Sequence, residues 1–202
     1  MPMVALSNEL TDALGDLTVD VREGFEASVW AVQDALSLHR AFRDTNVPRS
    51  ALTRAIIVDE FRVCAERRGL EARPGRGGAV ELYERNHDEY AVIRLRGAKE
   101  VGGELRVIAN SGSTWGGTSD DGFWREIPYV FGCLVNGTND SLDFFVAEVT
   151  GQTKAAVPHL EFGWVHRFQS PNPGNGAAFT PDEEDPLDGW DLLGQGDVDK
   201  LA

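Results

Sequence analysis

The chain has 202 residues, of which 42% are hydrophobic, and its formal net charge is −14. This length suffices for one domain with a sizeable core, and no apolar run approaches the roughly 18 to 20 residues that a membrane helix needs. We therefore expect no membrane protein. We also expect no nonspecific nucleic-acid binder, because contacts to phosphates require lysine and arginine and this chain is strongly negative.

The two ends of the chain carry most of the charge. Residues 1–20 contain four acids and no lysine or arginine, and residues 181–202 contain eight acids and one lysine. We therefore predict an acidic N-terminal arm over residues 1–19, a single globular domain over residues 20–168, and a linker with an acidic tail over residues 169–202.

The cellular setting is predicted from the N-terminus and the cysteines. No basic segment followed by an apolar core begins the chain, so we expect no secretory signal. The two cysteines, Cys64 and Cys133, each lie in an apolar pattern typical of buried thiols. These features predict a cytoplasmic protein.

Two helices are predicted before any strand. Between residues 20 and 43, apolar residues recur at helical spacing from Phe25 onwards, and Asp20 is a suitable N-cap. Ser50 is a suitable N-cap for a second helix, which ends just before Gly69. Together the two segments predict an αα-hairpin. The residues expected to widen the apolar face of its first helix are Trp30, Leu38 and Phe42.

The rest of the chain is rich in predicted strands. Tyr129 to Val135 is apolar on both alternating faces, so we expect this strand to be covered on both sides or to lie in the middle of a sheet. Alternation over residues 160–168 places Leu160, Phe162, Trp164, His166 and Phe168 on one face. The other expected strands cover residues 80–85, 90–96, 104–109 and 144–149.

Helices first and strands afterwards predict an α+β fold. We expect the N-terminal αα-hairpin to pack on one face of a mostly antiparallel sheet of five or six strands, with the acidic C-terminal tail following it. Residues 71–78 are interpreted as a loop, and residues 75–78 as a turn rather than a phosphate-binding loop, because they precede a strand.

An enzyme is considered as the alternative function. A divergent metal-dependent nuclease would need acids and a lysine brought together, and the candidates are Glu60, Asp143, Glu148 and Lys154. Their spacing is poor, and alternation places Asp143 and Glu148 on opposite faces of a strand. We therefore predict no catalytic residue from this set.

Other ligand or nucleophile patterns are weak as well. The four histidines, His39, His87, His159 and His166, show no common zinc-ligand spacing. The glycine- and serine-rich loop over residues 110–122 could support a hydrolase or close over a ligand beside Trp115 and Trp124, but it lacks the Gly-x-Ser-x-Gly elbow. We predict no metal and no cofactor.

The C-terminal tail is the most distinctive stretch. Mixtures of acidic and apolar residues are typical of segments that fold against a groove on a partner, where the apolar side chains are buried and the charges steer association. We expect the partner to be another protein with a basic or apolar groove. The alternative is a solubilising tail, or a tail that docks on its own domain and covers an apolar patch. The predicted partner-binding residues are Asp182, Glu183, Glu184, Asp185, Leu187, Trp190, Leu192 and Leu193.

These features favour a non-enzymatic protein-binding or regulatory module. One variant is an acidic inhibitor that mimics nucleic acid, of the kind associated with phage, defence or mobile-element systems. The alternative is the divergent nuclease or another hydrolase, and a third interpretation is an assembly subunit that uses an exposed strand edge.

Overall fold

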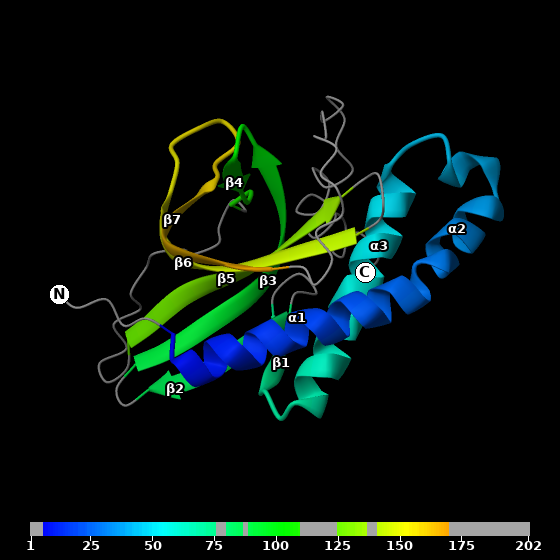
Figure 1. The fold of residues 1–202 in the computed structure, drawn as a ribbon. Helices are drawn as coiled ribbons and strands as arrows, with labels where there is room; N and C mark the ends of the chain where they lie inside the picture. Colours follow the sequence, from blue (N-terminus) through cyan, green and yellow to red (C-terminus); the bar gives the residue numbers. More distant parts are fainter. Residues whose placement is uncertain (1–5, 76–79, 87–88, 110–124, 137–140, 170–202) are drawn as a thin grey trace, which may run out of the picture.

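The α+β prediction is confirmed: helices occupy the N-terminal third and strands follow (Figure 1). The computed structural model describes residues 6–75, 80–86, 89–109, 125–136 and 141–169. Within these ranges a bent helical pair packs on a mixed, mostly antiparallel sheet. The predicted tail lies outside the described residues.

Helix α1 (Asn8–Ser28) begins well before the predicted start at Asp20. Ser7 is its N-cap, and the Ser7 hydroxyl oxygen accepts a hydrogen bond from the Leu10 backbone N–H at 3.0 Å. The turns over residues 8–19, predicted to belong to an acidic arm, are therefore packed helix, and their acids stand on its outer side. The side chains that these turns bury are Leu10, Leu14 and Leu17.

The long first helix predicted to residue 43 is divided into three pieces. After α1 the axis bends at Val29, where the Val32 backbone N–H donates to the Val29 carbonyl in a tight turn. Helix α2 (Trp30–Ser37) and the short 3₁₀ helix η1 (Arg40–Phe42) follow. In Figure 1 α2 extends beyond the sheet and leads through η1 back to α3.

Helix α3 (Val47–Arg67) starts three residues before Ser50, the predicted N-cap. Proline in the first turn is tolerated there, because the first N–H groups of a helix have no partner within it. The predicted end is confirmed. Gly69 adopts φ +71°, and the Leu70 N–H donates to the Ala65 carbonyl at 3.0 Å, which closes a Schellman motif.

The sheet is built from strands in the order β1-β2-β3-β5-β6-β7, and β4 pairs with β3. Neighbouring strands are antiparallel except β3 and β5, which are parallel. The predicted loop over residues 71–78 contains β1, a short strand that sequence analysis missed. The bounds are β1 (Ala72–Pro74), β2 (Val80–Asn86), β3 (Glu89–Val101), β4 (Glu104–Arg106), β5 (Arg125–Asn136), β6 (Ser141–Gln152) and β7 (Leu160–Phe168).

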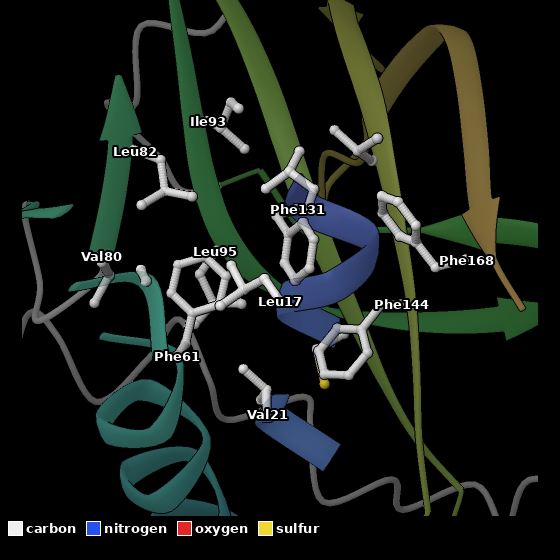
Figure 2. Packing of buried hydrophobic residues seen from close by; sticks show 14 of the residues in the cluster. Leu17, Val21, Phe61, Val80, Leu82, Ile93, Leu95, Phe131, Phe144 and Phe168 are labelled. Atoms are coloured by element: carbon white, nitrogen blue, oxygen red, sulfur yellow. The ribbon is translucent and has the colours of Figure 1, made fainter. Parts of the chain in front are cut away.

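The two-faced apolar pattern of β5 is explained by cores on both sides of the sheet. On the helix side, Phe131 lies at the centre of an aromatic cluster, with ring centroids 5.1 Å from Phe61 of α3 and 5.3 Å from Phe144 of β6. Figure 2 shows these rings together with Phe168 of β7 and Leu17 of α1. The helical pair therefore covers one face of β5, as predicted.

The second core lies on the opposite face, where the sheet curls back on itself. The Leu160 N–H donates to the Val107 carbonyl and the Ala109 N–H to the Pro158 carbonyl, both at 2.8 Å. These bonds join the segment after β4 to the start of β7. Because β4 also pairs with β3, they complete a ring in which β3, β5, β6, β7 and the β4 segment are each paired with two other members. Its interior residues are Ala98, Val107, Ala109, Val130, Leu134, Phe145, Ala147, Val149 and Leu160.

The prediction that the alternating residues of β7 share one face is wrong. The pairing between β6 and β7 shifts register near Val149, and a bulge of this kind turns the following side chains to the other face. Leu160 and Phe162 therefore belong to the second core, whereas Trp164 and Phe168 pack on the helix-side core. One strand thus contributes to both cores.

Candidate functional site

Exposed apolar side chains are concentrated in one stretch of the described chain. Of eight exposed large apolar side chains among the described residues, four lie between the start of α2 and the first residue of α3. We call this region, residues 30–54, the helical tip. Its four exposed apolar residues are Trp30, Leu38, Phe42 and Val47.

Three of these residues were predicted to be part of a buried helical face, and that prediction is wrong. Helix α2 buries its opposite side, through Val32 and Leu36, at 2% and 5% exposure. Trp30 and Leu38, two turns apart on the outer side, are 62% and 79% exposed. The apolar residues at helical spacing, Phe25, Val32 and Leu36, remain buried on both sides of the bend that follows α1, so the predicted face continues and only the residues expected to widen it are exposed.

The connection between α2 and α3 is ordered by local contacts. The Ala41 N–H donates to Nδ1 of His39 at 3.1 Å, and the His39 and Phe42 rings meet edge to face at 5.9 Å between centroids. A guanidinium N–H of Arg49 donates to the Gln33 side-chain oxygen at 3.3 Å and links α3 to α2. The apolar residues of the tip are therefore presented on a folded support.

The tip is also basic within an acidic chain. Residues 30–54 hold four arginines against two aspartates, a formal charge of +2, whereas the whole chain is −14. Arg40 and Arg43 are exposed beside Phe42. Aromatic and arginine side chains are enriched at protein interfaces, so this combination suits recognition of an acidic segment with apolar anchors.

The acids considered for a nuclease site are not brought together. Glu60 lies where α3 crosses α1, directly over Gly24, and accepts a hydrogen bond from the Ser28 hydroxyl at 3.3 Å. Asp143 pairs with Leu134 on the side of the second core, whereas Glu148 pairs with Tyr129 on the helix side. Among the described residues, no group of three His, Cys, Asp or Glu is placed to hold a metal ion.

The histidines occupy separate positions. His39 is the N-cap of η1, and His159 pairs with Ile108 where the sheet closes. His166 is exposed and lies parallel to Trp164 at 5.9 Å between ring centroids. His87 lies outside the described residues, as do the loop over residues 110–122 with Trp115, and Trp124.

Both cysteines are buried, as predicted. Burial raises the pKa of the Cys64 thiol and, more strongly, that of Cys133. A raised pKa keeps a thiol protonated and unreactive, so both are structural residues.

A polar cluster on the outer face of β1, β2 and β3 is internally satisfied. The Tyr83 hydroxyl donates to one carboxylate oxygen of Glu81 at 2.6 Å, and Arg94 Nε donates to the other at 2.7 Å. The Arg73 guanidinium lies 4.5 Å from the Tyr83 ring centroid. Burial, with the Glu81 carboxylate, raises the pKa of Tyr83 to about 12, so this hydroxyl serves as a donor and not as a base.

Arg22 is a buried charged residue that sequence analysis missed. Its Nε donates to the Leu142 carbonyl at 2.8 Å, and its guanidinium lies 5.3 Å from the Phe144 ring centroid. Burial lowers the pKa of Arg22, and its Nη2 has no partner within the described part of the chain. Arg22 joins α1 to the start of β6.

Comparison with protein-family models, with curated proteins and with solved structures finds no match to this chain. In the part of the chain that the structure describes, no helix combines the length and the apolar character needed to cross a membrane. The predicted partner-binding residues from Asp182 to Leu193 lie outside the described residues, so the helical tip is the candidate site that the structure adds.

Proposed function

We propose that this chain is a non-enzymatic protein-binding module and that the helical tip is the surface that binds its partner. The observation that carries the proposal is the two-sided character of α2. Helix α2 contacts α3 and buries Val32 and Leu36 on one side, while Trp30 and the C-cap residue Leu38 stand 62% and 79% exposed on the other. Single exposed apolar residues are ordinary, but several gathered on one protrusion indicate an interaction site.

The chemistry of the tip favours a particular class of partner. Tryptophan and arginine are the residues that most often dominate binding energy at interfaces, and the tip supplies Trp30 with Arg40 and Arg43 close in sequence to Leu38. A formal charge of +2 over residues 30–54 selects against basic partners. We infer that the partner presents an acidic segment with aromatic or aliphatic anchors.

A regulatory role fits this kind of contact. A short acidic segment that docks on a small surface buries limited area and exchanges readily, which is typical of transient complexes. The chain's own tail, from Asp182 to Leu193, has the same composition. A partner that carries a similar segment would therefore be recognised by the same chemistry.

A peptide-display selection tests the proposal. Random peptides of about 16 residues would be selected on the intact chain and on a second chain carrying Trp190→Ser and Leu193→Ser. These two substitutions remove apolar residues from the chain's own acidic tail, which could otherwise compete with the peptides for the tip. We expect enriched peptides to combine Asp and Glu with Trp, Leu or Phe.

The variant Trp30→Ser/Leu38→Ser removes the two most exposed apolar residues of the tip. The matched control is Val157→Ser/Val165→Ser, which removes two exposed apolar residues elsewhere. Substitutions at exposed positions change the free energy of unfolding by only about 0.5 kcal/mol, so both variants should fold. Selected peptides that bind the tip variant as well as the control would refute the assignment of the site.

A further inference from the structure

A surface that binds acidic, apolar segments is present in the same chain as such a segment. We propose that residues 181–202 cover the helical tip in cis, and that a partner reaches the tip by displacing them. This inference rests on the function proposed above and adds its regulation: the chain is self-inhibited until a competing acidic segment is present.

Charge and composition are complementary between the two parts. Residues 181–202 contain eight acids and one lysine, whereas residues 30–54 contain four arginines and two aspartates. Opposite charges steer the two parts together, and burial of apolar side chains stabilises the contact. The apolar residues available on the tail are Leu187, Trp190, Leu192 and Leu193, and those on the tip are Trp30, Leu38, Phe42 and Val47.

The position of the last strand makes this contact reachable. The Phe168 ring at the end of β7 lies 3.6 Å from the position that a Cβ on Gly15 would occupy, so the described chain ends against the middle of α1. From Gly15 to Leu38 the helical rise is at most about 35 Å. The twelve residues from 169 to 180 span up to about 40 Å when extended.

Docking within one chain has a concentration advantage. A short connection gives the attached segment an effective concentration in the millimolar range. A free peptide of residues 181–202 that binds the uncovered tip with a Kd of about 10 µM would therefore bind the covered tip about 100-fold more weakly.

The test titrates a fluorescent synthetic peptide of residues 181–202 into two full-length chains. One chain is unaltered, and the other carries Leu187→Ser, Trp190→Ser and Leu193→Ser in its own tail. We expect the peptide to bind the tail variant about 100-fold more tightly than the unaltered chain. Adding Trp30→Ser/Leu38→Ser to the tail variant should abolish this binding, whereas adding Val157→Ser/Val165→Ser should leave it unchanged.

Three outcomes would overturn the inference. Equal affinity for both chains means that the tail does not cover the tip. No binding to the tail variant means that the tail sequence does not fit the tip. A sedimentation experiment in which the unaltered chain is a dimer and the tail variant a monomer would place the tail on a second copy. The display selection distinguishes these results from failure of the proposed function. If only the inference about the tail fails, acidic peptides that bind the tip would still be enriched in that selection.

Discussion

Gly132→Ala is the substitution for which the structure gives the clearest expectation. A Cβ at this position would lie 2.0 Å from Cε1 and 2.1 Å from Cζ of Phe145, its partner on β6. Carbon atoms in favourable contact are about 3.5 to 4.0 Å apart. The ring must therefore move by about 1.5 Å, and it is fully buried with an edge-to-face contact to Phe162 at 6.0 Å.

The cost can be bounded from these contacts. Overfilling a packed core costs about 1 to 3 kcal/mol, and we expect the upper end because the Phe145 ring has no exposed side toward which it could move. For a chain of this size, 1 kcal/mol lowers Tm by about 2 to 4 °C, so Gly132→Ala should lower Tm by about 6 to 12 °C. Urea denaturation followed by circular dichroism measures the free energy directly.

A double-mutant cycle identifies the cause. In a Phe145→Leu background, Gly132→Ala should cost at least about 1 kcal/mol less than in the unaltered chain, because the smaller side chain leaves room for the methyl group. Gly15→Ala is the matched control. The nearest atoms to its Cβ, at 3.6 and 3.7 Å on Phe168, are at ordinary contact distance, so alanine should stabilise α1 by about 0.5 to 1 kcal/mol. Additive effects at Gly132 and Phe145 would refute the reasoning.

Three further outcomes are expected. Arg22→Ala should destabilise the chain by about 2 to 3 kcal/mol in urea denaturation, and Arg22→Met by less, since methionine fills the space without burying a charge. The bidentate hydrogen bond from Arg68 lowers the pKa of Asp20. The contribution of this ion pair is therefore present at pH 7 and is lost as the pH falls from about 4 through the lowered pKa of Asp20. The difference in unfolding free energy between the unaltered chain and Asp20→Asn, at most about 1 kcal/mol, should shrink over the same range. Cys64 and Cys133 should react with a thiol reagent only after denaturation, and rapid labelling of the native chain would contradict their burial.

Much of the fold could be predicted from local patterns. The end of α3 at Gly69 and the two-sided burial of β5 follow from residue chemistry that acts over a few positions. The start of α1 could not be predicted in this way. Acids on its outer side dominated the composition of residues 1–20, although Leu10, Leu14 and Leu17 recur at helical spacing and could have shown the buried face.

Features that depend on tertiary pairing were not visible in the sequence. The bulge opposite Val149 reverses the alternation of β7, and it arises from the pairing with β6 rather than from any residue type. The exposed tip was missed for a related reason, because periodicity identifies a face but not what covers it. The signal that could have found it is the position of Trp30 and Leu38 opposite Val32 and Leu36 on a helical projection.

The burial of β5 between two cores has a consequence for biosynthesis. Residues 129–135 carry no charge and have high β-propensity, which is the composition of a segment that aggregates when exposed. Chains fold from the N-terminus as they are made, and α1 and α3 leave the ribosome before this strand does. The helices can therefore shield one face of the strand at once, whereas its other face waits for β6 and the start of β7. Residues 137–160 are thus the part of the chain whose delayed synthesis would leave the protein most prone to aggregation.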